Sequence, residues 1–379
     1  MTIIEIFNSI AESIRNKLDI EDKILPINYS TQIDKIVTDI VLDKDINESI
    51  ECICKGLYKY NGSVNNLSVA RYGLAATTVG DYALFAGGYS NLSSVDAYNS
   101  SLSRSTATNL SEGKYNLAAT SVGNYALFGG GRGGGSILTT VDSYNTSLSK
   151  DTATELSVGR ESLVATTIDS YALFAGGRSG SKYSDIVDTY TKSLSKSIVT
   201  TLSEAKYDLA ATTVGSYALF GGGRAESELD TVDTYDLSLS HSISTVLSEA
   251  RYYLKATSVG SYAIFGGGCG TYLTYASVDT YDTSLSKGIT TVVLSEPRYS
   301  LAAATVSDFA IFAGGINSNN GSKFNTVDVY DSSLSQCTTP DLSVARYDLS
   351  ATTIGSYALF AGGRFSSNNS YATVDVYTA

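Results

Sequence analysis

The residue types that most often do chemistry in proteins are scarce or scattered in this sequence. Its one histidine is His241, so a single chain cannot supply a two-histidine copper site. The cysteines include no Cys-x-x-Cys pair and have no neighbouring histidine, which argues against a zinc site; they are Cys52, Cys54, Cys269 and Cys337. No Gly-x-Ser-x-Gly elbow and no tryptophan-bearing Asp-box is present. We therefore expect no metal, no cofactor, no catalytic residue and no enzymatic activity.

Charged residues instead recur at fixed places in seven copies of a repeat. One set is basic: Arg71, Lys114, Arg160, Lys206, Arg251, Arg298 and Arg346. The other set is acidic: Asp96, Asp142, Asp188, Asp233, Asp279, Asp328 and Asp375. A ring of cations would suit an anionic sugar or phosphate, but a residue present in every repeat usually serves every repeat. We interpret both sets as structural, with the cations bonding nearby carbonyls or glutamates.

The repeat that carries these charges fills the chain after about residue 60. Each copy reads LSxARYxLAATTVGxYALFAGG, then a variable stretch, then TVDxYDxSLS. One aromatic residue anchors each copy, at spacings of 43 to 48 residues: Tyr82, Tyr125, Tyr171, Tyr217, Tyr262, Phe309 and Tyr357. In the first copy the turn residues separate four short strands, at 74–79, 82–87, 94–99 and near 106–110. Seven such copies predict an all-β, seven-bladed propeller.

The two ends of the repeat region are expected to share one blade. The last copy stops at VDVYTA and has no fourth strand of its own. The segment SVNNLS at about 63–68 matches the fourth-strand position of the other copies, so we expect it to complete the last blade and remove two exposed sheet edges. The predicted propeller domain spans residues 61–379, behind a module of residues 1–60.

The double glycine after a hydrophobic run, followed by a Tyr-Asp pair, resembles Kelch repeats over roughly residues 61–379. One departure is clear, because the chain has no tryptophan where Kelch blades usually place one after the Tyr-Asp pair. We expect the leucines of SLS to fill that space between blades: Leu102, Leu148, Leu194, Leu239, Leu285 and Leu334.

Nearly all the length variation lies in one loop of each repeat. The stretch between the double glycine and the Val-Asp pair has 6 to 11 residues, while the other spacings stay almost constant. In an up-and-down blade these B–C loops share a face with the D–A links between blades. Their Ser, Gly, Asn, Tyr and Arg content suits adaptable recognition. The candidate ligand-binding residues are Tyr89, Arg132, Arg178, Tyr183, Arg224, Tyr272, Tyr275, Asn319, Asn320, Arg364, Asn368 and Tyr371.

The first sixty residues contain two helical patterns that cannot enclose a core alone. The first stripe has Ile3, Phe7, Ile10, Ile14 and Leu18, and the second has Ile33, Ile36, Val37 and Ile40. The stretch NSIAESIRNKLDIEDKILPINYSTQIDKI resembles a module near the N-termini of phage and prophage tail proteins of Gram-positive bacteria. Leu18-Asp19 stands where that module usually has Thr-Gly. The resemblance implies attachment to tail or baseplate proteins through residues 1–60, in multiple copies per particle.

Charge and hydropathy narrow the class of partner. The net charge of -12 and a pI of about 4.6 argue against nucleic acid and anionic membranes. The N-terminus lacks the pattern of a signal peptide, and no apolar run reaches about 18 residues. We therefore expect synthesis in a bacterial cytoplasm without a signal peptide, no membrane insertion, and location in a virion tail.

These features predict a receptor-binding protein of a phage or prophage tail that recognises a host cell-surface glycan or protein through the variable loops. Two alternatives remain. The propeller could be a structural baseplate or decoration component without a ligand. It could also be a glycan hydrolase that uses carboxylates alone, although no pair of non-repeating acidic residues stands out in the sequence.

Overall fold

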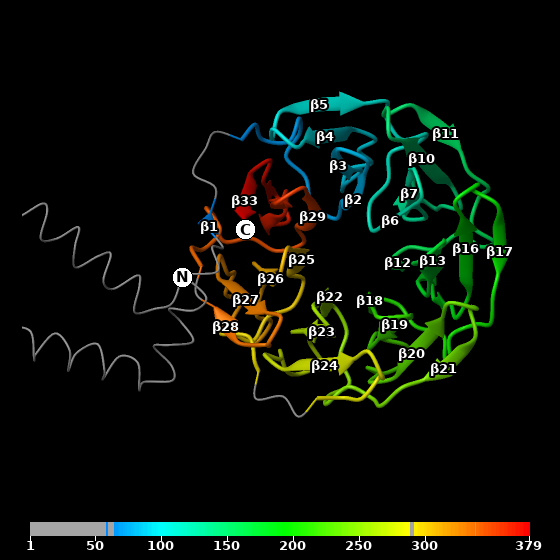
Figure 1. The fold of residues 1–379 in the computed structure, drawn as a ribbon. Helices are drawn as coiled ribbons and strands as arrows, with labels where there is room; N and C mark the ends of the chain where they lie inside the picture. Colours follow the sequence, from blue (N-terminus) through cyan, green and yellow to red (C-terminus); the bar gives the residue numbers. More distant parts are fainter. Residues whose placement is uncertain (1–57, 60–63, 289–291, 338) are drawn as a thin grey trace, which may run out of the picture. The chain divides into compact units, whose positions relative to one another are not determined.

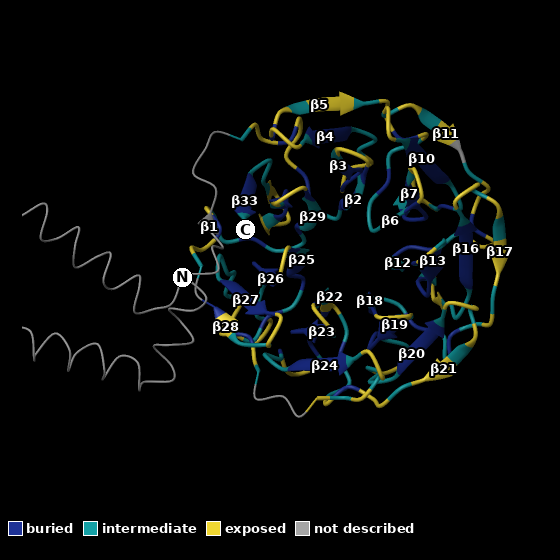
Figure 2. Cartoon of the chain, viewed as in Figure 1, coloured by how far each residue is buried: buried dark blue, intermediate teal, exposed yellow. Residues whose placement is uncertain are grey.

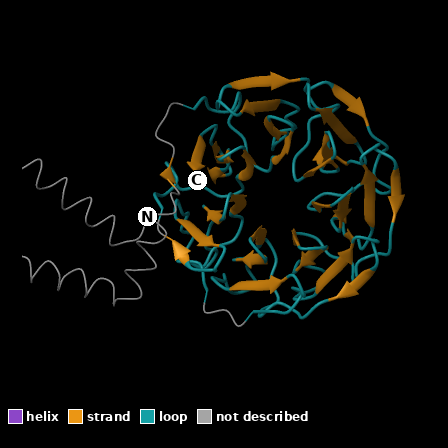
Figure 3. Ribbon diagram, viewed as in Figure 1, coloured by secondary structure: helices purple, strands orange, loops and turns teal. Residues whose placement is uncertain are grey.

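The computed structural model describes residues 58–59, 64–288, 292–337 and 339–379. The described residues form strands, turns and loops, and contain no helix (Figure 3). The compact unit that holds these strands spans Gly56–Ala379. The two helices expected within residues 1–60 lie outside the described residues.

Seven antiparallel sheets surround a central channel, and each sheet is one blade (Figure 1). The first four blades each have four strands. They are β2 (Ala75–Val79), β3 (Tyr82–Ala86), β4 (Val95–Asn99) and β5 (Arg104–Ala107); β6 (Ala118–Val122), β7 (Tyr125–Gly129), β10 (Val141–Asn145) and β11 (Lys150–Thr152); β12 (Val164–Ile168), β13 (Tyr171–Ala175), β16 (Val187–Thr191) and β17 (Lys196–Ile198); and β18 (Ala210–Val214), β19 (Tyr217–Gly221), β20 (Val232–Asp236) and β21 (His241–Ile243). The seven-bladed propeller predicted from the repeats is confirmed.

The other three blades follow the same order. Blade 5 has β22 (Lys255–Val259), β23 (Tyr262–Gly266) and β24 (Val278–Asp282); blade 6 has β25 (Ala302–Val306), β26 (Phe309–Ala313), β27 (Val327–Asp331) and β28 (Gln336–Cys337); and blade 7 has β29 (Ser350–Ile354), β30 (Tyr357–Ala361), β33 (Val374–Thr378) and β1 (Tyr58–Lys59). Small hairpins extend three B–C loops: β8 (Arg132–Gly133) with β9 (Ser136–Ile137), β14 (Arg178–Ser179) with β15 (Lys182–Tyr183), and β31 (Arg364–Ser366) with β32 (Asn369–Ser370).

Burial follows the position of each strand within its blade. The innermost strand alternates between buried and partly buried residues in four blades, as with Ala75, Thr77 and Val79 of β2, and is mostly partly buried in the other three. The second and third strands are buried almost throughout because neighbouring blades cover both of their faces (Figure 2). The outermost strand is largely exposed, as in β5 and β17. The channel is therefore lined by the first strand of every blade.

The strand that completes the last blade is β1, which pairs with β33 in the register Tyr58 to Thr378 and Lys59 to Tyr377. We expected this strand at about 63–68, and the structure has no strand within residues 64–68. The position of the closing strand follows from its pairing register with β33. Lys59 faces Tyr377 as Arg104 faces Tyr98, but it lies eight residues before the next LS leucine rather than six.

The double glycine lets each blade approach the next. Gly87 has φ +72, and a Cβ there would lie 2.5 Å from the Lys114 carbonyl oxygen of blade 2, too close for any side chain. The following glycine, Gly88, donates its N–H to the same carbonyl at 2.8 Å. Equivalent bonds of 2.8 to 3.0 Å occur at all seven junctions, and Gly363 to Arg71 closes the ring between blades 7 and 1.

The repeated cations and aspartates form a buried pair within each blade. The Arg71 guanidinium lies 2.6 Å from Asp96 and also donates to the Phe85 carbonyl at 3.0 Å. Asp96 in turn accepts from the Ser68 amide and hydroxyl in the link from the preceding blade. The structure thus agrees with the interpretation of both sets as structural. The remaining pairs are Lys114–Asp142, Arg160–Asp188, Lys206–Asp233, Arg251–Asp279, Arg298–Asp328 and Arg346–Asp375.

A second cation from the outer strand reaches most of these aspartates. Arg104 lies 3.2 Å from Asp96, and Lys150 lies 2.7 Å from Asp142. His241 occupies the same register position, and its Nε2 lies 2.8 Å from Asp233 Oδ1. His241 is half-buried, because its imidazole points back toward this aspartate.

Tyrosines and leucines complete the contacts between blades. The Tyr98 hydroxyl donates to the Asn65 carbonyl at 2.8 Å, and the equivalent tyrosine of every blade makes a similar bond of 2.7 to 2.9 Å. Leu102 packs against Leu359 and Val376 of blade 7. It therefore occupies the space between blades, as expected for the SLS leucines.

We predict that breaking one buried pair destabilises the whole ring. Replacing Asp279 with alanine leaves Arg251 charged and buried, so Asp279→Ala should lower the free energy of unfolding by about 3 to 5 kcal/mol. Denaturant unfolding of the full chain measures this change. Asp308→Ala, at an exposed turn, is the control and should stay within about 0.5 kcal/mol of the wild type. Equal effects of the two substitutions would contradict the structural role of the pair.

Candidate functional site

The B–C loops and the D–A links meet on one face of the propeller. The first residue of each loop pairs with a residue of the link, as in Tyr115 with Arg132 and Tyr347 with Arg364. In blade 1 the Tyr89 amide donates to the Tyr72 carbonyl at 2.8 Å. We call the seven paired link residues the collar. They are Tyr72, Tyr115, Glu161, Tyr207, Tyr252, Tyr299 and Tyr347.

One residue further along each link, the backbone turns left-handed. These residues form an inner ring with φ between +51° and +65°: Gly73, Asn116, Ser162, Asp208, Tyr253, Ser300 and Asp348. Each N–H donates to the carbonyl of the inner-ring residue in the preceding blade, over distances of 2.9 to 3.2 Å, and the bond from Gly73 to Asp348 closes the cycle. The backbone alone thus holds the ring, which leaves its side chains free to differ.

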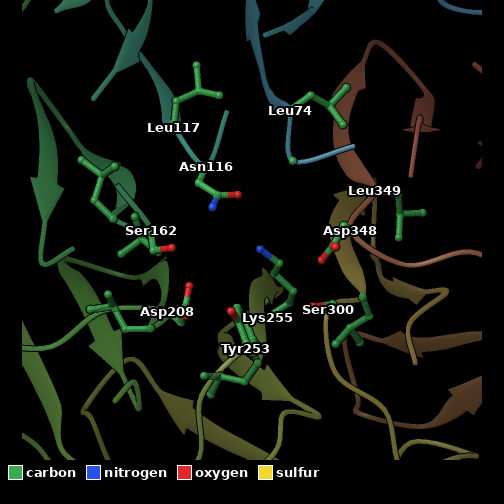
Figure 4. A pocket seen from close by; sticks show the side chains of 16 residues that line it. Leu74, Asn116, Leu117, Ser162, Asp208, Tyr253, Lys255, Ser300, Asp348 and Leu349 are labelled. Carbon is green, nitrogen blue, oxygen red and sulfur yellow. The ribbon is translucent and has the colours of Figure 1, made fainter. Parts of the chain in front are cut away.

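The inner ring surrounds a cavity of about 140 Å³ at the mouth of the channel (Figure 4). A second cavity of about 180 Å³ shares several of its lining residues and continues along the inner strands. Figure 4 shows Asn116, Asp208, Lys255 and Asp348 extending polar groups into the first cavity. Lys255 begins β22, where four of the other inner strands begin with alanine.

The charged groups of the mouth have different environments. Arg364 holds the Asp348 carboxylate through its Nε and Nη2 atoms, at 2.8 and 2.7 Å. Asp208 Oδ2 is buried and has no hydrogen-bond partner among the described residues. Burial raises the pKa of the Asp208 carboxyl to about 6, although the Ser162 and Tyr253 side chains bond to this carboxyl. Partial removal from water lowers the pKa of Lys255 despite the attraction of Asp348 and Asp208, and its side chain stays exposed at the mouth. Within the described part of the chain, Lys255 makes no ion pair.

Outside the mouth, a run of stacked side chains crosses three blades. The Arg364 guanidinium lies between two collar rings, 4.1 Å from the Tyr72 centroid and 4.8 Å from that of Tyr347. Tyr89 stacks on Tyr72 at 4.8 Å and meets Tyr115 edge-on at 5.1 Å. We call these five residues the aromatic arc. Tyr89 is 45% exposed, so the arc presents a π-surface to solvent.

Most of the predicted loop residues spread around this face, although Tyr89 and Asn368 line one pocket of about 370 Å³. Arg132 and Arg178 both lie 3.5 Å from Glu161, and Arg224 lies over the Tyr252 ring and donates to its hydroxyl at 3.1 Å. Tyr272, Asn319, Asn320 and Asn368 are exposed, Tyr275 and Tyr371 are half-buried, and Tyr183 stacks on Tyr207. None of the twelve lines the channel-mouth cavity, and only Arg364 is joined to it, through Asp348.

Sequence reasoning missed the residues that do converge. They come from the most variable position in RYxL, where the seven repeats carry Gly, Asn, Ser, Asp, Tyr, Ser and Asp. Lys255 is a second signal, because it interrupts the alanine that usually follows that leucine. Asp208 and Asp348 are thus a non-repeating acidic pair, whereas the sequence alone showed none. A single-residue difference at a fixed position leaves the repeat length unchanged, so it is less conspicuous in the sequence than the loops that differ in length.

Two further features, metal-binding clusters and membrane-spanning helices, are absent from the described residues. The described residues contain no group of three or more His, Cys, Asp or Glu side chains arranged to hold a metal ion. No helix in that part of the chain is long and apolar enough to cross a membrane.

We predict that Asp208 makes stability depend on pH. Its folded-state pKa of about 6 exceeds the roughly 3.9 of an unfolded aspartate, so the folded state binds more protons between these values and loses stability as pH rises through them. Asp208→Asn should therefore be more stable than the wild type at pH 7, by about 1 kcal/mol for a site that channel water reaches, and not at pH 4. Unfolding at both pH values, with Asp308→Asn as control, measures this. An unchanged difference at the two pH values would refute it.

Comparison with known proteins supports the fold. No protein-family model matches the chain, and no curated protein matches its sequence. Among solved structures, one titled "Structure of YjhT" is similar, with a TM-score of 0.56 and 14% sequence identity. The match covers 71% of this chain and 97% of the YjhT chain. At this identity the likeness supports the propeller architecture alone.

Proposed function

We propose that this protein is a receptor-binding protein of a phage or prophage tail, and that its loop face recognises a host cell-surface glycan. In this proposal the repeats are of the Kelch type, and residues 1–60 attach the propeller to the tail or baseplate. The resemblance of residues 8–36 to phage tail modules supports the location. The exposed aromatic arc supports the glycan.

The aromatic arc carries the proposal because its chemistry matches that of a sugar chain. Pyranose rings present C–H faces that pack on aromatic rings, and hydroxyl groups that bond to carboxylates, amides and guanidinium groups. The exposed Tyr89 ring, stacked on the buried Tyr72, offers the first kind of surface, and Arg364 with Asp348 offers the second. The arc follows the rim of the channel mouth, so a ligand lying on it would extend from one blade to the next.

Display on a tail would make weak binding sufficient. A single site with a millimolar Kd contributes only about 4 kcal/mol. Several copies on one particle engage the same surface at a high effective concentration and can raise the overall affinity by roughly 10² to 10⁴. An exposed arc with few enclosed contacts suits this kind of recognition.

One observation favours a second candidate, glycan hydrolysis. The mouth holds two carboxyl groups in unlike environments, with Asp348 paired to Arg364 and Asp208 raised in pKa, and such unlike pairs supply the acid and base of glycosidases. We expect any bound glycan to be recovered intact, because Arg364 already occupies the Asp348 carboxylate. Chromatography of the glycan after incubation checks this. Product release that Asp208→Asn abolishes would establish the hydrolase instead.

The recognition proposal predicts that exposed tyrosines of the loop face carry binding. Tyr272 is 86% exposed, so Tyr272→Ala should leave the fold intact. Tyr89→Ala removes the exposed ring of the arc. We expect the substitution at Tyr89 to weaken binding of the full chain to host cells or purified wall glycan about 5- to 20-fold, and that at Tyr272 to weaken it less. Labelled protein and a panel of Gram-positive strains provide the measurement.

The matched control is Leu237→Ala, which removes a 51% exposed apolar side chain on a C–D turn of the opposite face. It should bind as the wild type does. Equal binding by all three variants would rule out the loop face as the receptor-binding surface. Binding that protease treatment of the cells abolishes would identify a protein receptor instead. A wild type that binds no strain and no glycan would favour a purely structural baseplate part.

A further inference from the structure

The channel mouth holds two charged groups of opposite sign that form no ion pair within the described residues. Lys255 makes no ion pair and Asp208 Oδ2 no hydrogen bond within the described residues, and both extend into the same cavity (Figure 4). Elsewhere in the propeller, the buried cation of every blade is paired with its aspartate. These two groups therefore lie apart from the structural ion pairs, although the Ser162 and Tyr253 side chains bond to the Asp208 carboxyl.

In the sequence, too, these two residues differ from the structural ones, because they do not recur in every repeat. Lys255 stands where the other blades carry alanine, valine or serine, and Asp208 occupies the most variable position of RYxL. Neither residue is needed to form the ring, because the inner ring is closed by backbone hydrogen bonds alone. The Lys255 side chain is exposed at the mouth, but Asp208 Oδ2 is a buried polar atom without a hydrogen-bond partner, which costs about 1 to 3 kcal/mol. Such a group is explained if a ligand completes its bonding.

We propose that the channel-mouth cavity is the specificity pocket for a neutral sugar, which enters with its hydroxyl groups between Lys255 and Asp208. This inference rests on the proposed function and names the part of the glycan that is read there. A sugar hydroxyl has both a donor and an acceptor, so one hydroxyl donates to Asp208 Oδ2 and accepts from Lys255 Nζ. If Lys255 Nζ and Asp208 Oδ2 lie too far apart for one hydroxyl, two adjacent hydroxyls of the sugar bridge them.

The remaining groups of the mouth are of the same hydrogen-bonding kind. Asn116 offers an amide, Ser162 and Ser300 offer hydroxyls, and Tyr253 offers a 38% exposed ring that contacts Tyr252 and Tyr299. A sugar in the mouth would meet polar groups around its edge and an aromatic ring on one side. The collar and the aromatic arc lie directly outside, so the rest of a glycan chain can continue over them.

Charge favours a neutral sugar over an anionic one. The chain carries a net charge of -12, which repels anions at long range. The mouth itself contains Asp208 and Asp348, and only Lys255 is unpaired to oppose them. The seven buried cations, which a sequence reading could assign to an anionic ligand, are occupied by their own aspartates. A phosphate or carboxylate would therefore meet more repulsion than attraction.

The experiment uses the full chain with three soluble probes at millimolar concentration: neutral hexoses, a zwitterionic amino acid and an anionic sugar acid. Ligand-observed NMR reports binding, and the variants are Lys255→Met and Asp208→Asn. We expect a neutral hexose to bind and each variant to weaken it at least tenfold. Lys182→Met, an exposed lysine on a loop hairpin, and Asp308→Asn are matched controls that should bind as the wild type does. Unfolding curves confirm that all four variants are folded.

The outcomes separate this inference from the proposed function. If the amino acid or the sugar acid binds instead, with the same sensitivity to the two variants, the ligand class is wrong. If no probe binds, or if the hexose binds equally to Lys255→Met and Asp208→Asn, the pocket is not the specificity site. If host-cell binding survives both substitutions, the glycan proposal would rest on the aromatic arc, without the pocket. A wild type that binds hexose but no cell would overturn the receptor role and retain the pocket.

Discussion

The buried cation at each D–A link is the interaction on which the rest of the ring depends. Its side chain binds the aspartate of its own blade and a carbonyl of the second strand, as Arg71 binds Asp96 and Phe85. Its backbone carbonyl accepts the N–H of the second glycine in the preceding blade. One residue therefore fixes the link to two blades. The Nε atoms of the five arginines have no hydrogen-bond partner among the described residues, which explains why lysine replaces arginine in blades 2 and 4.

The buried cation also explains how residues of the loop face can vary without loss of the fold. The residue two positions after the cation must be left-handed, a conformation that costs a non-glycine residue roughly 1 to 2 kcal/mol. The closed cycle of inner-ring hydrogen bonds offsets that cost at every blade, whatever the side chain. Tyr253 and Asp208 can therefore occupy the same backbone position as Gly73. The constant residues hold the ring, and the variable ones face the channel.

The repeat pattern predicted most of the fold, because each strand is defined by local turns and by burial that recurs at a fixed period. The double glycine, the buried cations and the SLS leucines all take the places that their repetition indicates. The closing strand was misplaced for a physical reason. Its position was inferred from its distance to Leu67, whereas register is set by which residue faces Tyr377, and that residue is Lys59. The register of this strand could not be predicted from its distance to Leu67, because that distance differs from the equivalent distance in the other repeats.

The site was harder to predict, because its residues lie one repeat apart and meet only when the ring closes. Asp208 and Asp348 are 140 positions apart in the chain, yet both lie in the inner ring and line one cavity. A search along the chain finds variable loops, since insertions are conspicuous, while a single variable residue between constant neighbours is not. In a closed ring, however, one substitution per repeat is enough to change the mouth completely. Seven positions at one rim can therefore alter what the channel accepts while every contact between blades stays the same.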